Sequence, residues 1–365
     1  MIQAQRDTLY EQRDGRERHT HHEQRYPILG NGSFTQFFDA ATAGSATIVN
    51  HGGAVPGSSG ASATFFNGTS SAGNGTFINT ATPGATAGYI YFVDSSTAAE
   101  GTFTNDGFIS FSGSSTAANG IFTNGQGQIA FGASTTAGNG IFTCKGSETS
   151  GVEGSVIFFG GTADHATVTV EGGAVSGAGG ASIQFDGSAT AAAGNFTING
   201  GAISSADGGV AVFDGTTQGG SATFTINGGA VSGANGGRVI FDSDADGKQN
   251  CSAANATLIA NGGLNGGSGS VIEFQGNSSG GASRIKLFWN GGLDISNRST
   301  ILTVTIGSLE GSGIVFLGGN GLSVGGTNLD TTFSGVLQDG GSAGGTGDSL
   351  TKVGSGKLTL SGANT

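Results

Sequence analysis

Hydrophobic and polar residues alternate along most of the chain in runs of four to six residues, bounded by Gly-Gly, Asn-Gly or Asp-Gly. This pattern is typical of short β-strands that bury one face, and no stretch has the period of an amphipathic helix. The region between Ala166 and Ser243 holds three near-copies of one unit, with Phe185, Phe213 and Phe241 at intervals of 28 residues. One such unit cannot bury its apolar face alone, so the pattern predicts coils that stack on one another.

The same unit can be followed along most of the chain through two sets of apolar residues. Each unit is expected to open at one of Ile48, Phe77, Phe103, Phe122, Phe142, Val168, Phe196, Phe224, Leu258 and Ile285. Each is expected to close at one of Phe38, Phe66, Phe92, Phe111, Phe131, Phe159, Phe185, Phe213, Phe241 and Phe274. The interval from a closing aromatic to the next opening residue is 11 in most units, whereas the other half of the unit varies in length. We therefore predict an all-β fold, a single-stranded right-handed parallel β-helix (β-solenoid) of about 10 to 14 coils.

The variable half of the unit predicts the outline of the rod. Long units contain an extra run such as GGAVSGAGG at residues 172–180, which we expect to add a third short strand. The units between Phe103 and Phe131 lack this run, so the rod should be narrower there. Glycine suits the corners because it adopts positive φ without a Cβ clash.

These spacings divide the chain into four segments. Residues 1–30 are rich in charge, and residues 31–282 contain the regular β-helix repeats. The spacing loosens over residues 283–345, and residues 346–365 form a last, distinct segment. The first segment lacks the apolar run of a signal peptide, so we expect a charged, disordered tail outside the fold.

Composition and charge narrow the function classes. The 365 residues include 74 glycines but 3 prolines and no Gly-X-Y period, which excludes collagen. The formal net charge is −12, and the acidic excess falls in the repeats because residues 1–30 are balanced. No basic stripe is present for a nucleic-acid backbone, so we expect no nucleic-acid partner. No apolar run reaches the length of about 18 residues that suggests a membrane-spanning helix.

The sharpest local motif is an acidic loop. Asp242, Asp244 and Asp246, followed by Gly247, place carboxylates at alternate positions, as in the first half of an oxygen-rich Ca²⁺ loop. The twelfth position of this motif is Ala253, where such a loop has a bidentate Glu, so a solvated acidic loop is the alternative. The three aspartates are the candidate metal ligands, and Ca²⁺ is the candidate cofactor.

A second acidic feature is a column of aspartates. Asp186, Asp214 and Asp242 each follow a closing phenylalanine and share one position of the unit. Stacked about 5 Å apart, their carboxylates would raise one another's pKa, attract a cation or support acid–base chemistry on a glycoside. Asp-Gly is also a common way to form a tight turn, so a structural turn is the alternative.

Two further motifs match known catalytic sequences only in part. Arg284-Ile285-Lys286 is similar to one short motif of polygalacturonase-type β-helix hydrolases, but the companion acidic and histidine motifs are absent from the sequence. Residues 340–344 match G-x-S-x-G without the strand-to-helix elbow that this nucleophile motif requires. We therefore expect neither motif to form an active site.

Histidine and cysteine add no catalytic constellation. His51 and His165 are the histidines of the repeats, and both fall at expected turns without a Ser or Cys partner in register. Cys144 and Cys251 lie far apart and have no second ligand at metal-site spacing, so we expect buried or semi-exposed thiols and no disulfide or zinc site. No nucleophile–base pair can be proposed from the sequence, and no catalytic residue is expected.

Asparagine recurs just after the opening strand of many units. The recurring residues are Asn79, Asn105, Asn124, Asn199, Asn227 and Asn261. Stacked at one corner, their amides can hydrogen-bond along a column, so we expect a structural role for them.

The C-terminal segment, residues 328–365, resembles the autotransporter-associated β-strand repeat. The resemblance depends on TTFSGV at residues 331–336, SLTKVGSG at residues 349–356 and LTLSGANT at residues 358–365. That repeat occurs in passenger domains of bacterial autotransporters, where it is thought to assist folding and secretion, and it implies no catalytic residues. The resemblance implies an extracellular location at a bacterial cell surface and, as partner, a C-terminal outer-membrane β-barrel that is missing from this sequence.

We therefore expect a structural or adhesive segment of a secreted or surface-displayed passenger, without catalysis. Its expected partners are a host-cell or matrix surface, glycans or other bacterial cells. The alternative is a β-helix enzyme, either a lyase or a glycoside hydrolase, that degrades polysaccharide. The acidic repeats would repel an acidic polysaccharide, which disfavours this alternative.

Overall fold

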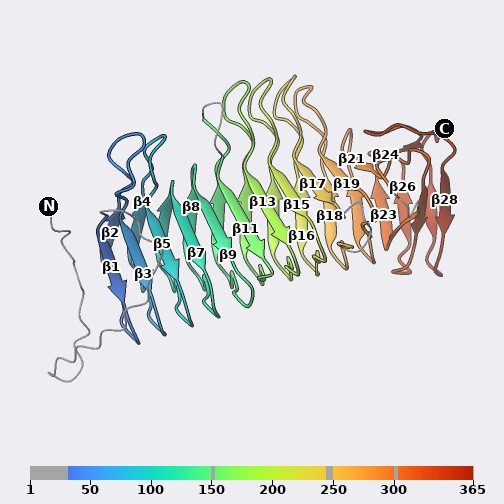
Figure 1. Cartoon of the computed structure of the whole chain (residues 1–365). Helices are drawn as coiled ribbons and strands as arrows, with labels where there is room; N and C mark the ends of the chain where they lie inside the picture. Colours follow the sequence, from blue (N-terminus) through green and yellow to red (C-terminus); the bar gives the residue numbers. More distant parts are fainter. Residues whose placement is uncertain (1–31, 149–152, 244–249, 300–302, 365) are drawn as a thin grey trace.

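The computed structural model describes residues 32–148, 153–243, 250–299 and 303–364. Within these residues every regular element is a β-strand, and the paired strands are parallel. They form two sheets of 13 strands and one of three, wound into about 13 coils that follow one another along a rod (Figure 1). The predicted all-β parallel β-helix and its number of coils are confirmed. The right-handed sense of the winding stays a prediction.

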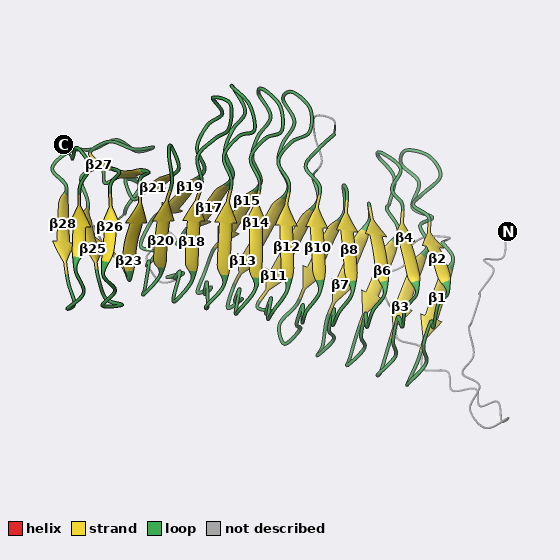
Figure 2. Cartoon of the chain, turned by 180° about the vertical axis from the view of Figure 1, so that it is seen from behind, coloured by secondary structure: helices red, strands yellow, loops and turns green. Residues whose placement is uncertain are grey.

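Each coil contributes one strand to each of the two large sheets (Figure 2). The first sheet contains β1 (Phe34–Phe37), β3 (Ala63–Phe66), β5 (Tyr89–Phe92), β7 (Phe108–Phe111), β9 (Gln128–Phe131), β11 (Ser155–Phe159), β13 (Ser182–Asp186), β15 (Val210–Phe213), β17 (Arg238–Phe241), β19 (Val271–Phe274), β21 (Gly292–Asp294), β24 (Ile314–Phe316) and β27 (Val336–Gln338). The second sheet contains β2 (Thr47–Asn50), β4 (Thr76–Asn79), β6 (Thr102–Asn105), β8 (Ile121–Asn124), β10 (Ile141–Cys144), β12 (Thr167–Val170), β14 (Asn195–Ile198), β16 (Thr223–Ile226), β18 (Thr257–Ala260), β20 (Arg284–Leu287), β23 (Ser308–Gly311), β26 (Thr331–Phe333) and β29 (Leu358–Leu360). The small third sheet contains β22 (Thr303–Ile306), β25 (Gly321–Val324) and β28 (Ser349–Lys352).

A repeated turn forms the short third side of the coil, between a strand of the first sheet and the next strand of the second. A Thr or Ser hydroxyl accepts a hydrogen bond from the N–H two residues on, as Thr116 Oγ1 does from Ala118 at 3.0 Å. That second residue has positive φ, 48° at Ala118 and 58° at Gly138. The residues at this position pair from coil to coil by single parallel bridges, from Thr42 to Ser279, and all of them carry a hydroxyl except Gln218. The repetition of this turn in the coils up to β20 explains the nearly constant spacing of this half of the unit. In the later coils, strands β22, β25 and β28 of the third sheet take this side.

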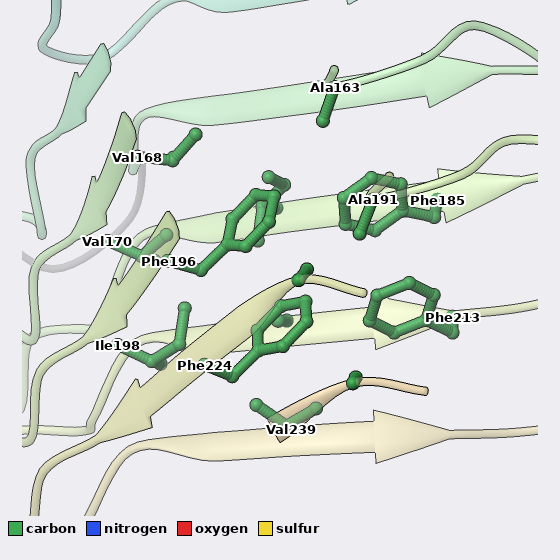
Figure 3. Close-up of a cluster of buried hydrophobic side chains, with 14 of the residues drawn as sticks. Ala163, Val168, Val170, Phe185, Ala191, Phe196, Ile198, Phe213, Phe224 and Val239 are labelled. Carbon is green, nitrogen blue, oxygen red and sulfur yellow. The ribbon is translucent and has the colours of Figure 1, made fainter. Parts of the chain in front are cut away.

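Two columns of stacked phenylalanine rings fill the interior. The first column contains Phe37, Phe66, Phe92, Phe111, Phe131, Phe158, Phe185, Phe213, Phe241 and Phe274, with neighbouring ring centroids 4.4–5.1 Å apart. The second column packs edge-on against the first, as Phe224 does against Phe213 at 5.6 Å and 75° (Figure 3). Each fully buried ring stabilises the fold by roughly 1.5–3 kcal/mol through burial alone. The coils are therefore held together chiefly by this shared interior.

The structure corrects two of the expected closing residues. Phe37 and Phe158, rather than Phe38 and Phe159, occupy the interior column, and Phe159 is 49 % exposed. Both places contain two consecutive phenylalanines, and a shift of one residue turns a side chain to the opposite face of the strand. The opening residues pair in the expected register along the second sheet, from Ile48 to Ile285.

The variable half of the coil consists of loops, so the expected third strand at residues 172–180 is wrong. Four long loops form a crest above the rod, at residues 171–181, 199–209, 227–237 and 261–270 (Figure 1). The backbones stack so closely that a Cβ on Gly200 would lie 2.4 Å from the carbonyl oxygen of Gly228. This glycine-to-glycine packing leaves no side chains to build a pleated strand. Between β6 and β9 the corresponding connections shrink to two or three residues, which confirms the predicted narrowing.

The two ends of the chain differ in what the structure describes. The expected charged tail, residues 1–30, lies outside the described residues. Residues 331–360, within the segment that resembles the autotransporter repeat, form strands β26 to β29, which continue all three sheets. In the described part of the chain, no helix has the length and apolar character that would let it cross a membrane.

Candidate functional site

The expected asparagine column separates into two ladders on opposite sides of the second sheet. The inner ladder consists of Asn50, Asn79, Asn105 and Asn124, the last residues of β2, β4, β6 and β8, which are 0–2 % exposed. Their side-chain amides are joined at 2.9, 2.9 and 2.7 Å. The outer ladder consists of Asn199, Asn227 and Asn261, which lie one position later and are joined at 2.8 and 2.9 Å. The expectation of a single column is wrong because a shift of one residue reverses the face.

The inner ladder is structural, because its amides also satisfy the backbone of the tight connections beside it. Asn105 Nδ2 donates to the carbonyl oxygens of Gly107 and Gln128 at 3.2 Å, and its Oδ1 accepts the N–H of Gly107 at 3.2 Å. The ladder ends at β10, because the same position is the apolar Cys144 there and Val170 in β12. Asn105 and Asn124 therefore stabilise the narrow coils, whereas Asn50 and Asn79 precede the longer connections of residues 51–62 and 80–88.

The aspartate column exists, but the side chains of two of its members bond within their own coils. The N–H of Asp214 donates to the carbonyl oxygen of Phe185 in the preceding coil, and the N–H of Asp242 donates to that of Phe213, both at 2.9 Å. The carboxylate of Asp186 accepts Gln184 Nε2 at 2.9 Å, and Asp214 Oδ1 accepts the N–H of Gly215 at 2.6 Å. The Asp214 contact agrees with the turn alternative, and at Asp186 the turn is shown by the N–H of Ala189, which donates to the carbonyl oxygen of Asp186 at 3.2 Å.

The Ca²⁺ hypothesis stays a prediction. Asp244 and Asp246 lie outside the described residues, whereas Asp242 ends the regular part of its coil, where its carbonyl oxygen accepts the Cys251 thiol at 3.0 Å. Among the residues that the structure does describe, no group of three or more His, Cys, Asp and Glu side chains could hold a metal ion.

The two partial catalytic motifs form surface contacts. Arg284 binds Glu310 of the next coil through its Nε and Nη2 atoms, and Ile285 is part of the core. The loop of residues 340–344 is anchored by Asp294, whose Oδ2 accepts the N–H of Ser342 at 2.8 Å. Within the described residues, the hydroxyl of Ser342 contacts only Ser296 Oγ, at 3.4 Å. No general base is therefore hydrogen-bonded to it there.

The remaining histidines and cysteines are no better placed for catalysis. His165 pairs with the adjacent Asp164 at 2.7 Å on the surface of its coil, and His51 lies in the first coil. Both cysteines are free and buried, and burial is the main reason why the pKa of each thiol is raised, to about 12 for Cys144. A thiol that holds its proton so tightly is a poor nucleophile at neutral pH.

An aromatic cluster lies on the outward face of the first sheet, where alternation would place polar residues. Tyr89 and Tyr91 of β5 and Phe108 of β7 point away from the core and are half-buried. Tyr91 stacks on Phe65 at 5.0 Å and on Tyr89 at 5.7 Å, and Phe108 meets Tyr89 edge-on at 6.1 Å. Burial, and then the neighbouring Tyr89, raise the pKa of Tyr91 to about 12. The cluster is missed by a search for interior phenylalanines, although YIYF in β5 shows aromatic residues at both outward positions.

A second aromatic feature is the corner after β20, just past the crest. Trp289 is 71 % exposed and has a φ of 54°, a conformation that costs a bulky residue roughly 1–2 kcal/mol. Asn290 holds this corner to the preceding loop: its Oδ1 accepts the N–H of Gly263 at 2.8 Å and its Nδ2 donates to Gly267 at 3.1 Å. Hydrogen bonding thus holds the strained backbone of the corner from which the exposed indole projects. The presence of a single tryptophan in the chain was the only sequence signal for it.

Comparison with known proteins identifies no relative. No family model matches the chain, and neither a curated protein nor a solved structure is significantly similar to it. A functional proposal therefore depends on the fold, on its surfaces and on the resemblance of residues 328–365.

Proposed function

We propose that the chain is a structural and adhesive segment of a secreted, surface-displayed, autotransporter-like passenger, and that it contacts glycans on a host-cell, matrix or bacterial surface. The single observation that carries the adhesive part is the corner at Trp289, where an exposed indole projects from a strained backbone that is hydrogen-bonded to the crest. A strained residue that the surrounding structure holds in place is a reason to look for a binding role there.

The chemistry of this corner suits a sugar ring. The flat face of an indole packs against the C–H groups of a pyranose, and a platform on a backbone fixed by hydrogen bonds loses less entropy on binding. Phe288 adds a second ring at 6.4 Å and 55°, and Leu264 at the tip of the preceding loop is 62 % exposed. Because the chain has a net charge of −12, neutral sugars are favoured over acidic ones.

The location and the passenger assignment depend on the resemblance of residues 328–365. In the structure this segment provides the last strands of all three sheets, so it extends the stack on which upstream coils rest. An element of this kind supports the proposed role in passenger folding and secretion. The interior contains no disulfide in the described residues, which suits a chain that crosses membranes unfolded.

The sole tryptophan makes a direct binding test possible. We expect neutral oligosaccharides on an array to bind the full chain and to change the fluorescence of Trp289 on titration. Trp289→Ala should weaken binding about tenfold, the loss expected when an aromatic platform is removed. Val55→Ala is the matched control, because Val55 is 60 % exposed on a loop near the other end of the rod. Binding that is equally weakened by both variants, or by neither, would rule out the Trp289 corner as the contact.

The polysaccharide-degrading alternative is an outcome of the same experiment. Release of reducing ends or unsaturated products from pectin-like polymers, abolished by Asp214→Ala, would replace the adhesive proposal with an enzymatic one.

A further inference from the structure

The outward face of the second sheet carries an ordered array of threonines. Six neighbouring strands of the second sheet, β6, β8, β10, β12, β14 and β16, have a threonine at the third position. These residues, all in one register, are Thr104, Thr123, Thr143, Thr169, Thr197 and Thr225. At the first position of the same strands are Thr102, Ile121, Ile141, Thr167, Asn195 and Thr223. We call these twelve residues the threonine face. Each strand thus presents hydroxyl and methyl groups to solvent in a repeated pattern.

The hydroxyls of the six-residue column have no partner within the described chain. The contrast with the third side of the coil is clear, because there Thr97, Thr116 and Thr136 each accept a backbone N–H at 2.9–3.0 Å. Threonine on the third side is therefore explained by its turn. Threonine on the face has no such structural function.

The face also lacks charge. From β2 to β18, nine strands of the second sheet have no Asp, Glu, Lys or Arg at an outward position, although the chain has 38 such residues. Charge returns at β20, with Arg284 and Lys286. The β-propensity of threonine explains its presence in strands, but it does not explain why charged residues, common on solvated sheet faces, are excluded here.

The spacing of the face is regular in two directions. Beneath it, the rings of Phe103, Phe122 and Phe142 stack at 4.5 and 4.7 Å with interplanar angles of 8° and 6°, so successive strands are close to parallel. Phe196 and Phe224 repeat this geometry at 4.5 Å and 9°. Along each strand, outward residues lie about 6.6 Å apart, twice the rise of a parallel strand. The result is a regular lattice of hydroxyl and methyl groups over a packed core.

We propose that the threonine face binds ice. Both repeats of the face are close to the spacings at which oxygen atoms recur on the surface of hexagonal ice. The hydroxyls can occupy the places of lattice oxygens. The methyl groups of the threonines, Ile121 and Ile141 can order the water molecules that lie between them on the face. A surface without charge is needed, because ions bind water in shells that do not match the lattice. Rigidity matters as well, since a face that does not rearrange loses little entropy when it docks.

The test measures inhibition of ice recrystallisation and thermal hysteresis by the full chain. Thr169→Lys and Thr197→Lys each put a charged, longer side chain in the middle of the face. We expect either substitution to raise the protein concentration needed to inhibit recrystallisation by about tenfold or more. Thr197→Val keeps the shape and one methyl but removes the hydroxyl, and its loss should be smaller. Ser182→Lys is the matched control, because Ser182 is a half-buried outward residue of the first sheet.

Each outcome decides the inference once an unchanged melting temperature shows that the variants are folded. Loss in both lysine variants of the face, with full activity in Ser182→Lys, supports it. Wild-type protein that inhibits ice growth no better than serum albumin overturns it. Equal activity in all variants, or equal loss in the control, overturns it as well, because the effect would then not depend on the face.

Discussion

Replacing Asn105 by alanine measures what the inner asparagine ladder contributes to stability. The side chain is fully buried, accepts hydrogen bonds from Asn79 Nδ2 and the N–H of Gly107, and donates to Asn124 Oδ1. Alanine would leave the Gly107 N–H and Asn124 Oδ1 without partners, whereas Asn79 Nδ2 keeps the carbonyl oxygen of Phe108 at 3.2 Å. A buried polar group left unpaired costs about 1–3 kcal/mol, so two such groups give an expected loss of about 2–6 kcal/mol.

Asn227→Ala is the matched control for this substitution. Asn227 also bonds to two asparagines, at 2.8 and 2.9 Å, but it belongs to the half-buried outer ladder. Water can replace the lost amide there, so the expected loss of stability is about 1 kcal/mol or less. The two variants remove the same chemical group and the same number of ladder bonds. They differ in burial and in the buried backbone groups of Gly107 and Gln128 that Asn105 also bonds.

The assay is native-state hydrogen exchange read by mass spectrometry, because a solenoid can open coil by coil and a single unfolding midpoint would average over its coils. Peptides that cover residues 102–131 report on Asn105, and peptides that cover residues 195–226 report on Asn227. We expect the free energy of opening to fall strongly in the first set for Asn105→Ala and little in the second set for Asn227→Ala. Equal losses in the two would refute the argument that burial decides the contribution of the ladder.

Two further predictions concern titratable groups. Burial raises the pKa of Cys144 to about 12 and also raises that of Cys251. An aromatic disulfide reagent at about pH 8 should therefore label neither thiol in the folded chain and both thiols in denaturant. Rapid labelling of the folded chain would contradict their burial. Burial, and then Asp339, raise the pKa of Asp348, so the folded chain binds this proton more tightly than the unfolded chain, and the resulting stability is lost as pH rises through the raised pKa. Asp348→Asn should therefore raise the melting temperature at neutral pH but not below the ordinary pKa of aspartate, and an equal shift at both pH values would contradict this cause.

The general plan of the fold was predictable from the sequence because it depends on local signals. Alternation over four residues specifies a strand with one buried face, and the nearly constant interval before the opening residues reflects a turn repeated in the coils up to β20. The stacking of Phe185, Phe213 and Phe241 followed from their equal spacing. The narrowing near β7 and β9 followed from the short connections there.

Other features depend on which residues neighbouring coils bring side by side, and those contacts exist only in the folded rod. A strand has two faces and a period of two, so an error of one residue moves a side chain from the core to solvent. That is why Phe38 and Phe159 were misplaced and why one asparagine column became two ladders. The threonine face arises in the same way, because its order lies across strands and is invisible along any one of them. The fixed corner at Trp289 likewise depends on hydrogen bonds from Asn290 to a loop more than 20 residues earlier in the chain.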